Sequence, residues 1–254
     1  MVAPRLLSVA RGASDLRREP KEAAELVHQV HIGEMLTLLA SRDAWHFVQA
    51  EDHYFGWIHG SSAAAQATSA TVARCVAVAL ADVHAEPDRS SPVVDRAPAG
   101  AWLPLGRRTD RGGWVAVTGG WIEEADTTRF NDLPRRAPTA EDLITTAEAF
   151  VGVPYLWGGT TALGLDCSGL VQQVYRLNGV RLDRDADQQA MEGRPVDVPA
   201  RGDLVFFGTA SVTHVGIALD EGRMLNALGS AKKVQANDID GIGVGVLAIR
   251  RYLP

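Results

Sequence analysis

The sequence predicts an α+β chain in which two small all-β modules precede a mixed domain whose helices come before an antiparallel sheet. Three observations support this fold class. The first half contains a divergent repeat of short apolar segments. Two segments after residue 138 have the apolar periodicity of helices, and strand-like apolar runs at 204–207, 215–219, 224–228 and 244–249 follow them. At roughly 100–200 residues per domain, a chain of 254 residues fits one large domain or two to three small ones.

The repeat relates residues 16–58 to residues 83–122 at a nearly constant spacing. The matched segments are residues 16–20 with 83–87, 33–36 with 100–103, 45–48 with 114–117, and 56–58 with 120–122. Apolar segments separated by turn residues are typical of a small β-barrel or sandwich. We therefore expect β modules at 1–66 and 67–127, a proline-containing linker at 128–137, and a third domain at 138–254.

Composition excludes several classes of function. The chain is 46% hydrophobic and 22% charged, with a formal net charge of −6 and no run of lysine or arginine, so we expect no nucleic-acid partner. The longest apolar runs are far shorter than the ~20 residues that span a bilayer, so we expect no membrane insertion. Residues 1–12 lack the apolar core of a secretory signal, roughly 7–15 residues long. The sequence therefore predicts a cytoplasmic protein, or a secreted one if a signal peptide has been removed. It does not give the oligomeric state.

Two helices are expected at the start of the third domain. Thr139 and Asp142 form a capping-box pattern ahead of the first. In the second, apolar residues at 170, 171, 174 and 175 make one stripe, and Asn178-Gly179 is a stop signal. Counting back from that stripe places Cys167 in the first turn.

Cys167 is the candidate nucleophile. A helix N-terminus stabilises a thiolate through unpaired N–H groups and the helix dipole, and the backbone N–H of Cys167 is placed to stabilise an oxyanion. Spacing alone leaves a buried structural cysteine equally open. Cys75 lies in the apolar run 72–80 and is expected to be a core residue, so two free thiols are predicted.

His214 is the candidate base because it is the only histidine after His84. It opens an apolar segment, residues 214–219, that has the pattern of a strand, which places the imidazole at a sheet end. A lone polar residue at a strand edge is the alternative, but the pairing with a cysteine at a helix start favours catalysis.

Asn226 is the candidate third residue, which would orient the imidazole. If residues 220–222 form a three-residue loop with left-handed Gly222, Leu219 pairs with Arg223 and Asn226 lies opposite Gly216. Asn226 then faces the same side as His214. An ordinary asparagine near a turn remains the alternative. No metal site or cofactor is expected, because the histidines at 28 and 31 have no accompanying cluster of ligands.

Four ordered segments carry a resemblance to the NlpC-type cysteine peptidase family. They are residues 154–159 (PYLWGG), 165–171 (LDCSGLV), 201–207 (RGDLVFF) and 213–217 (THVGI). The resemblance covers residues 138–254 and implies a papain-like fold with Cys167 as nucleophile and His214 as base. Asn226 stands where this family commonly has a histidine. The first half resembles bacterial SH3-like domains in its order of Gly-Glu, Trp-x-x-Val and Gly-Trp-Ile, which implies two SH3-like barrels.

With these modules, the chain resembles the γ-D-glutamyl-L-diamino acid endopeptidases. The resemblance implies cleavage of the γ-D-Glu–diamino acid bond in small murein peptides that have a free N-terminal L-Ala, in peptidoglycan recycling. Asp185, in Arg184-Asp185-Ala186, is then expected to bind the substrate ammonium. Further expected substrate contacts are Asp166, Ser168, Tyr155, Tyr54 and Glu34. A secreted hydrolase of intact wall, a non-catalytic wall-binding protein and an acyltransferase remain as alternatives.

Overall fold

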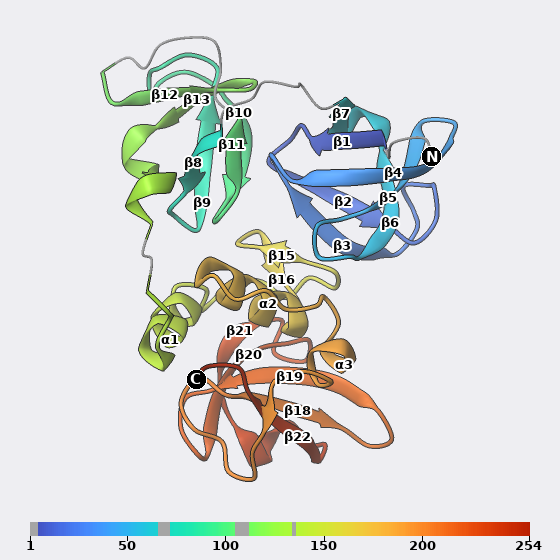
Figure 1. The fold of residues 1–254 in the computed structure, drawn as a ribbon, viewed down its shortest axis with the longest axis vertical. Coiled ribbons are helices and arrows are strands. Elements are labelled where there is room, and N and C mark those ends of the chain that lie inside the picture. Colours follow the sequence, from blue (N-terminus) through green and yellow to red (C-terminus); the bar gives the residue numbers. More distant parts are fainter. Residues whose placement is uncertain (1–4, 66–71, 105–111, 134–135) are drawn as a thin grey trace. The chain divides into compact units, whose positions relative to one another are not determined.

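The computed structural model describes residues 5–65, 72–104, 112–133 and 136–254. The chain divides into two compact units, Met1–Arg135 and Arg136–Pro254. No helix within the described ranges is long and apolar enough to cross a membrane. The ribbon in Figure 1 shows that unit 1 is built from strands and that the longer helices belong to unit 2.

The first module of unit 1 is a seven-stranded sheet with the order β3-β2-β6-β5-β4-β1-β7. Its alternating apolar residues enclose a core that includes Leu16, Val30, Leu36, Val48 and Ile58. The strands are β1 (Arg5–Val9), β2 (Ala13–Arg17), β3 (Leu26–His31), β4 (Met35–Arg42), β5 (Trp45–Gln49), β6 (Phe55–His59) and β7 (Ala63–Ala65), with the 3-10 turn η1 (Gly60–Ser62) before β7.

The second module of unit 1 contains two smaller sheets, with the orders β10-β9-β13-β12 and β11-β8-β14. They enclose a second apolar core that includes Ala81, Val83, Leu103, Val115 and Ile122, and Ile32 of the first module also packs into it. The elements are β8 (Val72–Val76), β9 (Leu80–His84), β10 (Val93–Pro98), β11 (Trp102–Pro104), β12 (Trp114–Val117), β13 (Gly120–Glu123), η2 (Glu124–Asp126), β14 (Thr127–Arg129) and η3 (Phe130–Asp132).

The two modules repeat the same pairing. Trp57 of β6 pairs with Arg17 of β2, and the equivalent Trp121 of β13 pairs with His84 of β9. The modules also touch within unit 1, since the Gly12 N–H donates to Asp95 Oδ2 at 2.8 Å. The expected linker at 128–137 is shorter than predicted, because residues 127–129 form β14 and pair with β8. The polar threonines there are strand formers whose backbone completes a sheet edge.

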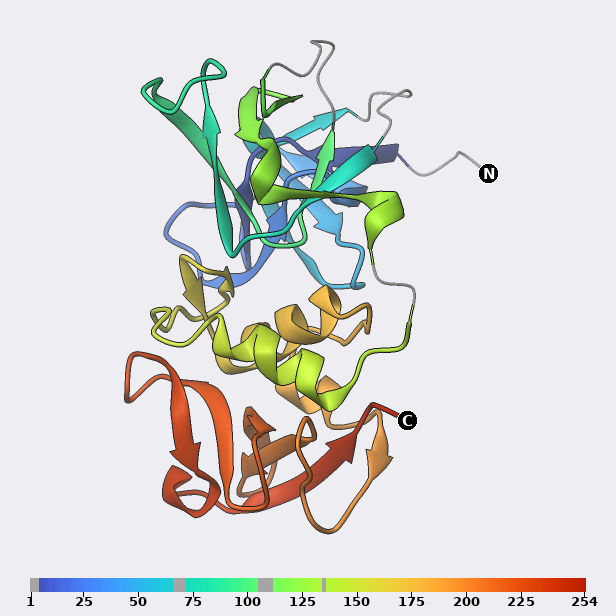
Figure 2. The same ribbon diagram turned by 90° about the vertical axis from the view of Figure 1, so that its left-hand side faces the viewer.

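Unit 2 joins two main helices to a six-stranded sheet with the order β17-β22-β18-β19-β20-β21. Figure 2 shows α1 and α2 together on one side of this sheet. The helices are α1 (Ala140–Glu148), α2 (Cys167–Leu177), α3 (Ala186–Gln189) and the 3-10 turn η4 (Ile239–Ile242). The strands are β15 (Thr160–Thr161), β16 (Gly164–Leu165), β17 (Arg194–Pro195), β18 (Leu204–Gly208), β19 (Val212–Ala218), β20 (Arg223–Leu228), β21 (Lys233–Asp238) and β22 (Val246–Arg251).

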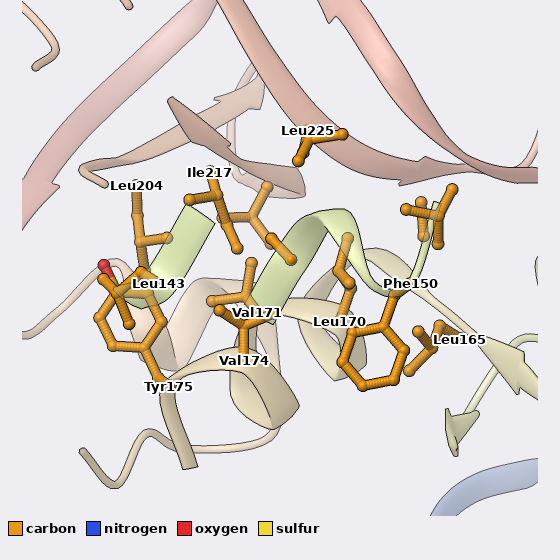
Figure 3. Close-up of a cluster of buried hydrophobic side chains, with 14 of the residues drawn as sticks. Leu143, Phe150, Leu165, Leu170, Val171, Val174, Tyr175, Leu204, Ile217 and Leu225 are labelled. Atoms are coloured by element: carbon orange, nitrogen blue, oxygen red, sulfur yellow. The ribbon is translucent and has the colours of Figure 1, made fainter. Parts of the chain in front are cut away.

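The sheet of unit 2 has an apolar layer on each face. Leu204 and Phe206 point into the core beneath the helices, whereas Val205 and Phe207 pack on the opposite face with Met224. Figure 3 shows the helical side of this core, where Val171 and Val174 of α2 meet Ile217 and Leu225 of the sheet (other members are labelled there). This packing fixes α2 against β19 and β20, the elements that carry the candidate catalytic residues.

The start of α1 and both ends of α2 agree with the sequence prediction. Thr139 caps α1 and makes the capping box with Asp142, and Asn178 caps the C-terminus of α2 ahead of Gly179, which has a φ of +80°. At its N-terminus, α2 lies against a glycine loop. A Cβ added at Gly169 would stand 2.1 Å from the Gly159 carbonyl oxygen, so only glycine permits this close approach.

Candidate active site

Cys167 is the first residue of α2, as the apolar stripe predicts. Asp166 is the N-cap, and its Oδ1 accepts a hydrogen bond from the Gly169 N–H at 2.7 Å. The thiol is half-buried and free, and Cys75 is also free but buried in β8. Capping by Asp166 sets the direction of the first turn and so the position of the thiol.

The Asp166 carboxylate accepts hydrogen bonds from several groups of the protein itself. Arg184, which is 1% exposed, makes two hydrogen bonds to it at 2.6 and 3.0 Å and donates to Ser168 Oγ at 2.8 Å. The Gly158 N–H also donates a hydrogen bond to the Asp166 carboxylate, at 2.8 Å. Such a buried, paired carboxylate holds the loop before α2 in place. Direct contacts of Asp166 and Ser168 with substrate stay predictions, and the geometry favours a scaffolding role for Asp166.

The environment of Cys167 opposes a resting thiolate. Burial and the nearby Asp166 carboxylate raise the pKa of the thiol to about 11, although the backbone N–H groups of Val215 and Ser168 act in the opposite direction. Desolvation is the largest of these effects and acts against the stabilisation of a thiolate by the helix terminus. A base must therefore remove the proton as the sulfur attacks. The hydrogen bond from Val215 also shows that the start of α2 meets β19 beside His214.

The hairpin of β19 and β20 has the register predicted from the three-residue loop. Ile217 lies opposite Leu225 and Ala218 opposite Met224, which continues to Gly216 opposite Asn226. A Cβ added at Gly216 would stand 3.2 Å from the Asn226 Cβ. The prediction of a left-handed Gly222 is wrong, since its φ is not positive.

The loop is closed instead by the Asp220 side chain. Its Oδ1 accepts hydrogen bonds from the N–H groups of Gly222 and Arg223 at 3.0 and 2.9 Å. An aspartate that bonds to the backbone two residues ahead makes this turn without a left-handed residue. The predicted loop and the observed loop have the same length, and this length sets the register of the hairpin.

His214 and Asn226 form the polar centre beside the cysteine. The His214 ring packs against Phe207 on the adjacent strand, with centroids 5.8 Å apart. Burial lowers the pKa of His214, whereas hydrogen bonding with the Asn226 side chain raises it. By strict hydrogen-bond geometry, His214 Nε2 and Asn226 Oδ1 are each buried without a partner among the described residues. Both atoms are complementary, since one is an imidazole nitrogen and the other an amide oxygen, and the Asn226 side chain is near enough to His214 to raise the pKa of the ring.

Tyr155 and Asp185 are the remaining expected substrate contacts in unit 2. Tyr155 is half-buried close to Cys167 and Asp166, where desolvation and their negative charges raise the pKa of its hydroxyl to about 12. Asp185 is the N-cap of the short α3, and its N–H donates to Gln188 at 3.1 Å. Their contacts with substrate stay predictions.

The expected contacts in unit 1 belong to the first SH3-like module. Glu34 is buried, with Oε1 at 3.8 Å from the Nδ1 of His31, and the Tyr54 ring packs 5.4 Å from the His28 ring. His28 in turn pairs with Asp52 at 3.1 Å. No group of three or more potential ligands is placed to hold a metal in the described parts of either unit.

Sequence reasoning missed three residues around the site. Arg184 entered only as part of a motif, although it is the main partner of Asp166. Gln235 and Asn237 were not considered, yet Asn237 Oδ1 accepts hydrogen bonds from Asn226 at 3.1 Å and from Gln235 at 3.2 Å. The alternation of polar residues at 235 and 237 was the available signal of a face directed at Asn226.

Comparisons with known proteins agree with this architecture. A model described as the NlpC/P60 family matches residues 152–245, and one described as the bacterial dipeptidyl-peptidase Sh3 domain matches residues 16–62. A γ-D-glutamyl-L-lysine dipeptidyl-peptidase of Bacillus cereus is 35% identical over 145 residues, covering 53% of this chain and 43% of the relative. A protein of the same description from Bacillus subtilis is 41% identical over 103 residues, covering 38% of this chain and 35% of the relative. The matched part therefore spans less than half the length of either relative.

The fold is also that of a solved structure. The crystal structure of an NlpC/P60 family protein from Bacillus cereus covers 98% of this chain and is itself covered completely, with a TM-score of 0.85 at 23% identity. The agreement extends over both units, so α+β describes the chain, with SH3-like modules followed by a papain-like domain.

Proposed function

Since residues 152–245 match the NlpC/P60 family and residues 16–62 match a bacterial SH3 domain, we propose that the chain hydrolyses the γ-D-Glu–diamino acid bond of small murein peptides with a free N-terminal L-Ala. One observation carries the proposal. The thiol of Cys167, at the start of α2, lies beside β19, where His214 and Asn226 form a buried polar pair. Names of the relatives that refer to γ-D-glutamyl-L-lysine support the class of bond.

The chemistry follows from the protonation states at the site. Neutral His214 accepts the thiol proton as Cys167 Sγ attacks the γ-carbonyl carbon of D-Glu. The oxyanion that forms accepts a hydrogen bond from the Cys167 backbone N–H at the start of α2. The imidazolium then protonates the departing amine of the diamino acid, leaving a thioester. Water, deprotonated by His214, attacks the thioester and releases L-Ala-D-Glu and the free thiol. Asn226 orients the ring throughout.

The free amine is the proposed source of selectivity. Asp185 is the proposed partner of the L-Ala ammonium, with Glu34 and Tyr54 of the first module as further contacts. A carboxylate that is desolvated by a bound substrate and receives no cation is left unsatisfied, and discrimination of this kind reaches about 10⁴-fold. In the intact wall, an amide to the sugar blocks this amine. The proposal therefore places the enzyme in the recycling of free peptides, in the cytoplasm.

The test compares three substrates with one preparation of the protein. We expect rapid cleavage of L-Ala-γ-D-Glu-L-Lys or its diaminopimelate analogue, almost none of the N-acetylated tripeptide, and none of intact peptidoglycan, with fragments identified by mass spectrometry. Equal cleavage of free and acetylated peptides would contradict the amine anchor and favour a hydrolase of intact wall. No turnover of any substrate, with an unreactive thiol, would favour a non-catalytic wall-binding protein. Transfer to an added amine instead of water would favour an acyltransferase.

A further inference from the structure

Three amide side chains lie next to one another on the hairpin of β20 and β21. Asn226 lies opposite Gln235 in the register, and Asn237 follows two residues later on the same strand. Asn226 is fully buried, and its Nδ2 donates to Asn237 Oδ1 at 3.1 Å. Gln235 Nε2 donates to the same oxygen at 3.2 Å. Both lone pairs of Asn237 Oδ1 are therefore engaged by N–H donors.

This arrangement fixes which end of the Asn226 amide faces His214. An amide presents either a donor or an acceptor to a neighbour, depending on its rotation by half a turn. Because Asn237 offers an oxygen, the Nδ2 of Asn226 must point toward Asn237. Oδ1 is then left for the imidazole. Asn226 Oδ1 and His214 Nε2 are both among the five buried side-chain atoms that have no hydrogen-bond partner within the described residues.

The direction of the Asn226 amide selects the tautomer of His214. An oxygen opposite Nε2 requires a proton on Nε2, which leaves the lone pair on Nδ1 free to accept a proton. A reversed amide would place an N–H opposite Nε2 and shift the imidazole proton to Nδ1. That tautomer has no lone pair on Nδ1, so a base reacting through this nitrogen would be lost.

We propose that Asn237 is a positioning residue, whose side-chain oxygen holds the Asn226 amide in the orientation that gives His214 the reactive tautomer. The proposal rests on the proposed function only in taking His214 as the base for Cys167. Gln235 supports Asn237 by donating to the same oxygen. The effect on catalysis passes through Asn226, and no contact of Asn237 with substrate is involved.

Two substitutions at position 237 separate polarity from packing. Asn237→Asp offers only acceptor oxygens and preserves the direction of the Asn226 amide. Asn237→Leu has a similar branched shape but no acceptor. We expect Asn237→Leu to lower kcat about tenfold, the equivalent of losing one hydrogen bond of ordinary strength, with KM little changed. Asn237→Asp should stay within about threefold of wild type on the same scale. Asp238→Leu, at an exposed neighbour on β21, is the matched control.

The decisive readout does not require a substrate. We would measure the rate of alkylation of Cys167 by iodoacetamide against pH for the wild type, the two variants at 237 and the control. The rate falls as pH drops and His214 becomes protonated. Since the Asn226 interaction raises the pKa of His214, Asn237→Leu should move this fall to lower pH, and Asn237→Asp should restore it.

The double variant Asn226→Ala, Asn237→Leu should behave like Asn226→Ala alone, because Asn237 acts through Asn226. A wild-type alkylation profile for Asn237→Leu would overturn the proposal, as would a further loss in the double variant. Failure to cleave the tripeptide would contradict the proposed function, while the alkylation profiles would still decide the role of Asn237.

Discussion

At the scale of single residues, burial and Asn226 shift the pKa of His214 in opposite directions. This predicts the direction in which a substitution moves the pH profile of activity. Burial lowers the pKa of His214 below its ordinary 6.5, and the Asn226 side chain is the interaction that raises it. Activity requires the neutral imidazole, so the rate is lost as pH falls through this pKa. Asn226→Ala should therefore move the acid limb of kcat/KM to lower pH. It should lower the rate about 10- to 100-fold, against about 10⁴-fold for His214→Ala.

The measurement is kcat/KM against pH for both variants, with Tm as a check that the fold is intact. Equal losses in Asn226→Ala and His214→Ala would give Asn226 a direct part in proton transfer. A limb that moved to higher pH would mean that Asn226 does not stabilise the imidazolium.

The two thiols should differ in reactivity although neither rests as a thiolate. Burial raises the pKa of both Cys75 and Cys167. Cys167 is half-buried beside a base, whereas Cys75 is 7% exposed within β8. Iodoacetamide near neutral pH should therefore label Cys167 first, and His214→Ala should slow that labelling about 10²-fold or more. Peptide mapping measures the order in which the two thiols are labelled. In a separate assay, Cys167→Ala should abolish turnover with little change in Tm. Labelling of Cys75 first would contradict the assignment.

Residues of the site were predictable where local rules applied. The helical stripe placed Cys167, and the length of the loop placed Asn226 opposite Gly216. Arg184 was not predictable in this way, since its bond to Asp166 joins segments that no period or turn relates. Burial, which raises the pKa of Cys167 against the effect of the helix terminus, is a property that a sequence gives only coarsely.

At the scale of elements, the position of α2 depends on Gly169, which has no side chain. A Cβ at Gly169 would lie 2.1 Å from the Gly159 carbonyl oxygen, which is backbone and cannot swing away. Gly169→Ala should therefore push α2 from its loop and lower the free energy of unfolding by about 1–3 kcal/mol. Because Cys167 lies in the same turn, kcat should fall as well.

Gly222→Ala is the matched control for this helix contact. A Cβ added at Gly222 would have Asp220 Oδ1 as its nearest neighbour, at 3.9 Å, and the φ of this residue is not positive. We expect a change within about 0.5 kcal/mol. Chemical denaturation of both variants measures the difference, and a Gly169→Ala protein as stable as Gly222→Ala would show that the close approach is not maintained in solution.

Among the elements of unit 2, those with strong periodicity were predictable. The four apolar runs at 204–207, 215–219, 224–228 and 244–249 correspond to β18, β19, β20 and β22. Strand β21 was missed because its sequence, KVQAND, is mostly polar. It forms because it pairs with β20 along six residues, so backbone hydrogen bonds to a neighbour outweigh its weak propensity.

At the scale of the whole molecule, each unit has a core of its own. The repeat predicted the two β modules because each copy carries a complete set of core positions, and the clusters in unit 1 are separate from those of unit 2. The end of the second module was less predictable. Residues 127–129 are polar and have the composition of a linker, and only pairing with β8 makes them a strand.

Separate cores predict that residues 136–254 fold without the modules. All of Cys167, His214, Asn226 and the Asp166–Arg184 pair lie in this unit, as do the apolar layers on both faces of its sheet. A fragment of residues 136–254 should unfold cooperatively. It should also keep the pH profile of Cys167 alkylation seen in the full chain.

The same fragment tests what the first module adds to selectivity. If Glu34 and Tyr54 contact the substrate, as proposed, the fragment loses part of the site for the L-Ala ammonium while Asp185 remains. The kcat/KM for the free tripeptide should then fall by about 10²-fold or more, and discrimination against the N-acetylated peptide should shrink with it. In the full chain, Glu34→Gln should give part of the same loss and leave thiol alkylation unchanged. A fragment that discriminates as well as the full chain would assign selectivity to Asp185 and its own unit, and would remove the first module from substrate recognition.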